Sequence, residues 1–200
     1  NKQIQGNKKI YQIVFFIFLA YLACGFGIVV VNTDKKEIQD TYYIGPNASS
    51  IEVYSIAFDL NHIYVATESG IYYADKNNPN LANFEEWQKT SNIAFPNSKY
   101  TSILEFNNSI YACYYDNSAD KSIIYRLQEN QWLEFYSDNK TVTKLNSSNN
   151  RLFVIEENAI IIFNNNLIEE RRITDYGFAA AEPFDALYDT DNKLYIADRY

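Results

Sequence analysis

Residues 56–75 read IAFDLNHIYVATESGIYYAD, and copies of this stretch recur along the chain. Residues 13–32, IVFFIFLAYLACGFGIVVVN, align beneath it without a gap, so that Tyr21 falls under Tyr64. Three further copies follow, and each has an aromatic residue at the same place. These aromatic anchors are separated by 43, 47, 42 and 42 residues, and they are Tyr21, Tyr64, Tyr111, Phe153 and Tyr195. A period of about 40–45 residues that is rich in short strands is typical of β-propeller blades.

Each repeat divides into four short strands separated by turns. The Glu-Ser-Gly sequence at 68–70 suits the tight turn of a hairpin. In this repeat, which is the clearest copy, strands are expected at 53–58, 62–67, 71–74 and around 85–89. We therefore predict an all-β fold, a partial β-propeller in which residues 1–200 form about four and a half to five four-stranded blades of a larger disc.

The most apolar stretch of the chain, residues 13–31, admits two interpretations. Nineteen uncharged residues preceded by two lysines are long enough to span a bilayer or to form part of an export signal. The repeat favours the other interpretation, in which the stretch forms strands that are covered on both faces and are therefore apolar throughout. Gly25 and Gly27 then mark the turn between the second and third strands. We predict blade strands and no transmembrane helix, although the first turn falls at the apolar residues Phe16–Leu19, where other copies are polar.

Charge and composition narrow the class of function. The formal net charge of −8 argues against nucleic acid as a partner, because affinity for it depends on Lys and Arg contacts to phosphates. Aromatic residues make up 16% of the chain, which favours strands and excludes disorder. The chain begins at Asn1 and contains no Met, so we expect it to be a piece cut from a longer protein, or a processed protein.

Few residues are suited to catalysis or to metal binding. His62 is the single histidine, which removes a Ser-His-Asp or Cys-His system and leaves no zinc ligand set. Cys24 and Cys113 belong to the first and third repeats, which are not neighbours, so we expect buried thiols and no disulfide. Glu68 and Glu157 take equivalent turn positions, and the repeat explains this carboxylate pair without catalysis. We predict no enzymatic activity, no catalytic residue, no metal site and no cofactor.

Two stretches of the chain carry motifs that are more specific than the propeller repeat. They are AYLACGFGIVVVNTDKKEIQDTYYIGPNAS at 20–49 and IAFDLNHIYVATESGIYYADKNNPNLANFEEWQK at 56–89. Both resemble the amino-terminal β-propeller of the PorZ family, a component of the type IX secretion system of Bacteroidota. The repeats from residue 102 onward match that family in the spacing of the repeats more than in residue identity.

The resemblance implies an exported protein at the cell surface, associated with the outer membrane, that acts as a non-enzymatic scaffold in type IX protein secretion. It also implies two partners, a sortase-like protein of the secretion complex and the anionic lipopolysaccharide that is attached to secreted cargo. No catalytic residue is carried over. The alternative is the periplasmic ligand-sensing propeller of a hybrid two-component regulator, because such sensors use very similar repeats.

A candidate binding face follows from the order of strands in a blade. The turns between second and third strands share one face of a propeller with the loops that join the blades, and ligands usually bind there around the central channel. Phe26, Glu68 and Glu157 are predicted on this face, together with the loop 92–100. The negative net charge does not favour an anionic ligand, so any basic residues that bind one must be concentrated locally.

Overall fold

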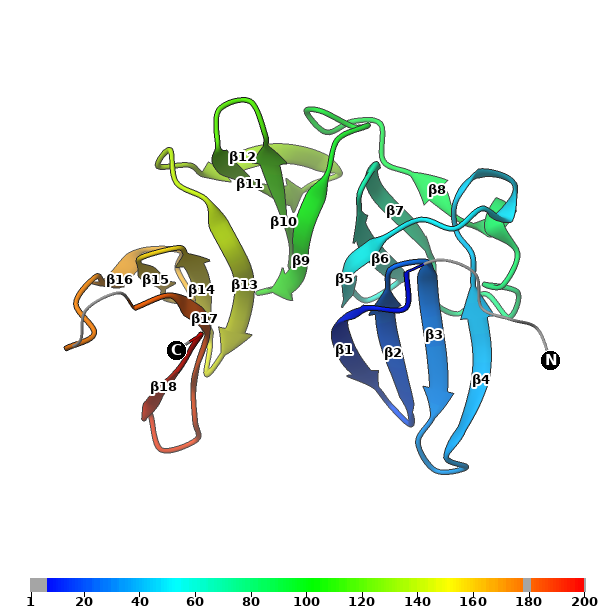
Figure 1. Cartoon of the computed structure of the whole chain (residues 1–200), viewed down its shortest axis with the longest axis horizontal. Coiled ribbons are helices and arrows are strands. Elements are labelled where there is room, and N and C mark those ends of the chain that lie inside the picture. Colours follow the sequence, from blue (N-terminus) through cyan, green and yellow to red (C-terminus); the bar gives the residue numbers. More distant parts are fainter. Residues whose placement is uncertain (1–6, 178–180, 200) are drawn as a thin grey trace.

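The computed structural model describes residues 7–177 and 181–199, which form an open arc of β-sheets (Figure 1). Four sheets contain four antiparallel strands each, and a fifth contains two. Strands follow chain order within every sheet, and the sheets follow chain order around the arc (Figure 1). The predicted all-β propeller fragment is confirmed. Parts of the predicted 1–200 domain, residues 1–6, 178–180 and 200, lie outside the described residues.

The strands of the five sheets have the following bounds. The first sheet contains β1 (Ile10–Phe16), β2 (Leu19–Cys24), β3 (Gly27–Asn32) and β4 (Glu37–Tyr42). The second contains β5 (Val53–Phe58), β6 (His62–Thr67), β7 (Gly70–Asp75) and β8 (Gln88–Lys89). The third contains β9 (Tyr100–Phe106), β10 (Ser109–Asp116), β11 (Lys121–Gln128) and β12 (Gln131–Tyr136). The fourth contains β13 (Val142–Ser148), β14 (Arg151–Glu156), β15 (Ile160–Phe163) and β16 (Glu169–Ile173), and the hairpin contains β17 (Pro183–Tyr188) and β18 (Leu194–Asp198).

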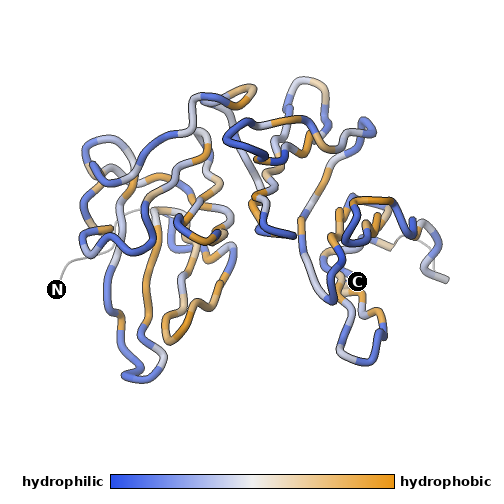
Figure 2. The backbone as a smooth tube through the Cα atoms, turned by 180° about the vertical axis from the view of Figure 1, so that it is seen from behind, coloured by the Kyte–Doolittle hydropathy of each residue, from blue (hydrophilic) through white to orange (hydrophobic). Residues whose placement is uncertain are grey.

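The apolar stretch 13–31 forms strands of the first sheet. It lies in β1, β2 and β3, with turns at Ile17-Phe18 and Gly25-Phe26. Within the described residues, no helix is long and apolar enough to cross a membrane. The turn between β1 and β2 is indeed apolar and stands out in orange among the hydrophilic turns of Figure 2. Ile17 is 76% exposed there.

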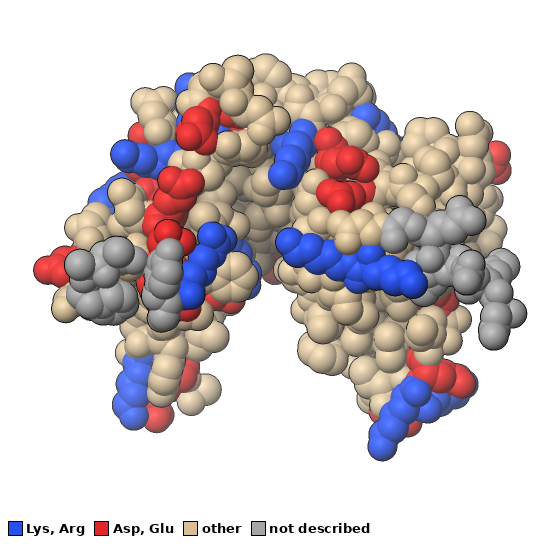
Figure 3. Space-filling view, viewed as in Figure 1, with Lys and Arg blue, Asp and Glu red and all other residues tan. Residues whose placement is uncertain are grey.

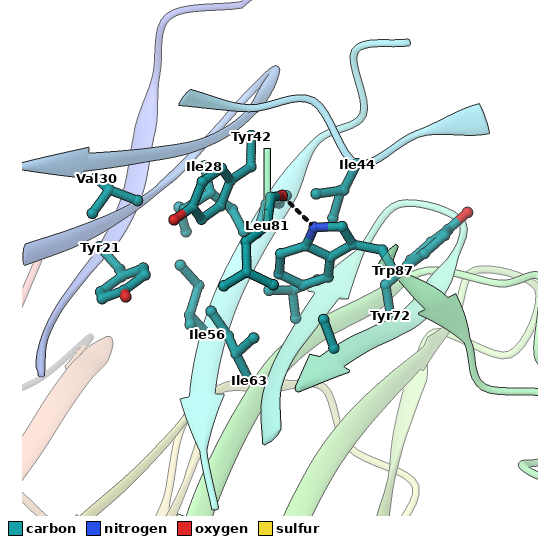
Figure 4. Packing of buried hydrophobic residues seen from close by; sticks show 14 of the residues in the cluster. Tyr21, Ile28, Val30, Tyr42, Ile44, Ile56, Ile63, Tyr72, Leu81 and Trp87 are labelled. Atoms are coloured by element: carbon teal, nitrogen blue, oxygen red, sulfur yellow. Dashed lines mark hydrogen bonds between the residues drawn. The ribbon is translucent and has the colours of Figure 1, made fainter. Parts of the chain in front are cut away.

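Apolar side chains fill the space between neighbouring sheets. Tyr21 and Ile28 of the first sheet pack against Ile56 and Ile63 of the second (Figure 4). Strands of the inner sheets therefore carry apolar residues on both faces, and β14 and β15 are buried along most of their length. All five aromatic anchors lie in the second strand of their sheet, and all except Tyr195 are buried.

Side-chain hydrogen bonds join the first strands of neighbouring sheets at every junction. Each bond links a polar side chain of one first strand to the backbone of the next, because these strands lie closest to the centre of the arc. The bonds are Ile56 N–H to Gln12 Oε1 (2.6 Å), Ser55 Oγ–H to Ile103 O (2.9 Å), Leu145 N–H to Ser102 Oγ (3.2 Å) and Tyr188 N–H to Ser148 Oγ (2.8 Å).

The fourth strand of the second sheet differs from the prediction. Residues 84–86 form a 3₁₀ turn, and only Gln88 and Lys89 form strand β8. The Asn83 side chain accepts a hydrogen bond from Glu85 N–H at 3.2 Å, which caps the turn and diverts the backbone from an extended path. The side chain of Trp87 is thereby buried, and its indole N–H donates to Leu81 O at 2.9 Å (Figure 4).

Candidate functional site

One face of the arc carries the turns between second and third strands together with the loops that lead into the next sheet. Gly70, the first residue of β7, has a φ of +127°, and a Cβ at this position would clash with the carbonyl oxygen of Pro96. Gly27 has a φ of +146°, and a Cβ at this position would clash with the carbonyl oxygen of Tyr42. Glycine is needed because the loops cross directly over the turns. We call this surface the candidate face.

The three residues predicted on the candidate face have different surroundings. Glu68 and Glu157 are exposed in equivalent turns of the second and fourth sheets. Phe26 is only 3% exposed, and its ring packs 5.8 Å from that of Tyr43. The aromatic side chain is buried because the segment after β4 covers it. Phe26 therefore supports the turn and does not offer its ring to a ligand.

Glu68 belongs to a network that the sequence did not indicate. Its Oε1 accepts a hydrogen bond from the backbone N–H of Glu52 at 3.1 Å. The Glu52 carboxylate in turn accepts from Tyr54 Oη at 2.7 Å and from Tyr11 Oη at 3.2 Å. The bond from Tyr54 is the main reason why the pKa of Glu52 lies below its ordinary value. Since Tyr11 comes from the first sheet, the network joins the first two sheets at the candidate face.

A hollow of about 280 Å³ lies at the centre of the arc and is lined by the first strands of all five sheets. Two lysine side chains lie beside the hollow, each over the aromatic ring of a tyrosine that lines it. The Lys9 ammonium lies 4.8 Å from the centroid of Tyr11, and that of Lys99 lies 4.9 Å from the centroid of Tyr54. Lys144, on the opposite side, forms an ion pair with Asp185. Figure 3 shows basic side chains on both sides of the central groove. Lysine ammonium groups thus lie around the hollow together with the carboxylates of Glu52 and Asp185.

A second polar cluster lies beside Glu157. The Tyr136 hydroxyl is 2.8 Å from both Asp138 Oδ2 and Glu156 Oε1. Burial and contact with Asp138 raise the pKa of Glu156 to about 7. The pKa of Asp138 is lowered, because hydrogen bonds from Glu156, Tyr136 and Arg172 outweigh its burial. Sequence reasoning missed Glu156, although a signal existed. The residue three places after the anchor is uncharged in the first three repeats and is a glutamate in the fourth.

The single histidine and the two cysteines lie in packed surroundings. The His62 Nδ1 atom lies 3.5 Å from Asp59 Oδ1, and the imidazole packs edge-on against Tyr64 and Tyr73. Among residues 7–177 and 181–199, no three His, Cys, Asp or Glu side chains gather as a metal site would require. Both cysteines are buried free thiols, as predicted. The features available to a ligand are therefore lysines, aromatic rings, hydroxyls and carboxylates.

Comparison with known proteins identifies relatives of this fold. Residues 1–88 match the family model described as the N-terminal β-propeller domain of PorZ from the type IX secretion system. No curated protein matches the chain.

Solved structures extend the likeness beyond residue 88. PorZ of Porphyromonas gingivalis, a bacterial surface component of that secretion system, superposes with a TM-score of 0.69 and 18% identity over 94% of this chain. The extracellular domain of a putative one-component system from B. thetaiotaomicron also has a TM-score of 0.69, with 14% identity over 99% of the chain. The chain spans only 23% and 26% of the lengths of these two proteins. The resemblance to the PorZ amino-terminal propeller is thus confirmed by the family match over residues 1–88, and the propeller fold extends over nearly the whole chain.

Proposed function

We propose that this chain is part of a non-enzymatic interaction module that supports type IX protein secretion at the cell surface of a member of the Bacteroidota, in association with the outer membrane. The observation that carries this proposal is the match of residues 1–88 to the PorZ propeller family. The first strands support it, because their polar side chains are used in contacts between sheets: Ser55 and Ser102 bond to the backbone of the next first strand, and Lys144 forms an ion pair with Asp185.

The proposed partners are a sortase-like protein of the secretion complex and the anionic lipopolysaccharide that modifies secreted cargo. An acidic chain binds such a glycan only through local positive charge. Lys9 and Lys99 offer this charge beside the central hollow, where Lys99 also attracts the Glu52 carboxylate and contributes to the lowered pKa of that group. We assign the lipopolysaccharide to these two lysines, and the protein partner to the exposed turns of Glu68 and Glu157.

A double charge reversal tests the assignment in the native host. The variant Lys9→Glu with Lys99→Glu should reduce lipopolysaccharide-modified cargo on immunoblots of the cell surface, while the abundance of the protein stays unchanged. The matched control is Lys35→Glu with Lys36→Glu, which changes the charge equally at the exposed β3–β4 turn, at the opposite end of the first sheet. Equal cargo modification in both double variants and the unaltered strain would contradict the proposed glycan site.

A ligand-sensing role is the second candidate, and the equally similar extracellular domain from B. thetaiotaomicron favours it. Deletion of the gene separates the two functions. Loss of a secretion component should retain type IX cargo inside the cell, whereas loss of a sensor should leave secretion intact and abolish a transcriptional response to a glycan. Normal secretion after deletion would refute the leading proposal.

A further inference from the structure

At the junction between the third and fourth sheets, two carboxyl groups compete for the proton of one tyrosine hydroxyl. Tyr136 Oη lies 2.8 Å from both Asp138 Oδ2 and Glu156 Oε1, and Asp138 and Glu156 also contact each other. A phenol has one proton and can donate it to only one of two carboxyl groups. Two ionised carboxylates in contact repel each other, so such a pair favours an additional shared proton.

The surrounding charges place this proton on Glu156. The Arg172 guanidinium donates to Asp138 Oδ2 at 3.1 Å and to Tyr136 Oη at 3.3 Å, so the cation stabilises the ionised form of Asp138. Arg172 also forms an ion pair with Glu169 of the same strand, with 3.0 Å between Arg172 Nε and Glu169 Oε1. Glu156 is 1% exposed and has no direct bond to the guanidinium. Other titratable groups face the pair: Tyr176, in the segment after β16, interacts with both Glu156 and Asp198 of β18, and the exposed Glu157 follows Glu156 in the chain.

The same pair connects two parts of the chain. Asp138 lies in residues 137–141, which cross from β12 in the third sheet to β13 in the fourth. Backbone bonds also hold this crossing segment: Glu157 N–H donates to Thr141 O at 3.2 Å, and Ser122 N–H donates to Lys140 O at 2.8 Å. A change at Glu156 therefore acts on the contact between the crossing segment and the turn that carries Glu157.

We propose that Glu156 and Asp138 form a pH-sensitive junction: with Glu156 protonated, the pair holds the crossing segment against the fourth sheet, and ionisation of Glu156 releases it. The stabilisation is complete below the ordinary pKa of a glutamate, about 4.3. It is lost as the pH rises through about 7, because the folded state holds a proton that the unfolded chain releases. The inference goes beyond the proposed role in secretion and does not depend on it.

The test compares the protein with its Glu156→Gln variant between about pH 5 and about pH 9, a range that spans this titration. Glutamine has the shape of the protonated acid and can both accept from Tyr136 and donate to Asp138. The denaturant midpoint of the unaltered protein should fall between about pH 5 and about pH 7 and then level off, and that of Glu156→Gln should not fall in this range. Hydrogen exchange, corrected for its intrinsic pH dependence, should rise in residues 137–141 of the unaltered protein only.

The matched control is Glu157→Gln, which removes the adjacent exposed carboxylate and should keep the pH dependence of the unaltered protein. A ¹³C NMR titration of the Glu156 carboxyl group needs no variant and therefore does not depend on whether Glu156→Gln folds. It should give a midpoint near pH 7. A midpoint below about 5, the range of an ordinary glutamate, would overturn the proposal. An identical fall in the midpoint for Glu156→Gln would do the same.

Discussion

The fourth sheet and the β17–β18 hairpin have the same sequence pattern but very different burial. Phe153 in β14 and Tyr195 in β18 are equivalent anchors, yet Phe153 is fully buried and Tyr195 is 55% exposed. The fourth sheet lies between two sheets, whereas the hairpin packs against a neighbour on one face, through residues such as Leu194 and Ile196. Burial of a propeller strand is therefore set by the sheets on either side of it, and the strand's own sequence only permits it.

The first sheet shows the same dependence at the other end of the arc. Its face toward the second sheet is packed, as Figure 4 shows for Tyr21 and Ile28. On the opposite face, Ile13 is 51% exposed and Phe15 is 72% exposed. These apolar surfaces are of the kind that a neighbouring sheet covers elsewhere in the arc.

Truncation of the two anchors should give the largest difference between these regions. Phe153→Ala removes a fully buried ring and should lower the free energy of unfolding by about 3–5 kcal/mol. Tyr195→Ala should cost less than about 1 kcal/mol, because its ring is already half in water. Denaturant unfolding of both variants measures the difference. Similar losses would mean that the ring of Tyr195 is buried in solution.

The propeller period was predictable because each repeat carries its signals within its own short stretch of sequence. Each repeat places an aromatic anchor and a turn at fixed distances, so the strands around Tyr64 or Tyr111 could be located without knowing their neighbours. The 84–86 turn was missed because a single side-chain cap at Asn83 decides it.

The candidate site was less predictable because it depends on contacts between repeats. The position of Glu68 in a turn followed from the sequence, whereas its connection to Glu52 required the structure. Phe26 was expected at the ligand face and is buried by a residue 17 positions later, Tyr43. The meeting of Asp138 with Glu156 likewise depends on how the third and fourth sheets pack.

The hydrogen bonds between first strands should show a smaller contrast between inner and end junctions. Ser55 Oγ donates to Ile103 O and accepts from Ile103 N–H within a buried junction. Ser55→Ala should therefore lower the free energy of unfolding by about 1–3 kcal/mol, since it leaves both backbone groups without this partner. Ser148→Ala removes one bond, to Tyr188 N–H at the partly exposed hairpin junction, and should cost about 1 kcal/mol or less. A larger loss at Ser148 than at Ser55 would contradict the idea that burial sets the strength of these junctions.

A small effect of the opposite sign is expected at the turn between first and second strands, where the first sheet differs from the third and fourth. The first turn residue has a left-handed φ in all three sheets: +56° at Ile17, +52° at Asn107 and +51° at Asn149. Asparagine tolerates this conformation, whereas a β-branched residue is strained in it. Ile17→Asn should therefore raise the free energy of unfolding by about 1 kcal/mol. Phe18→Asn is the control, because the φ of Phe18 is not left-handed and the strain argument predicts no gain there. If Ile17→Asn destabilised the protein, the exposed isoleucine would have to make a stabilising contact in solution, and the apolar turn would be part of an interface.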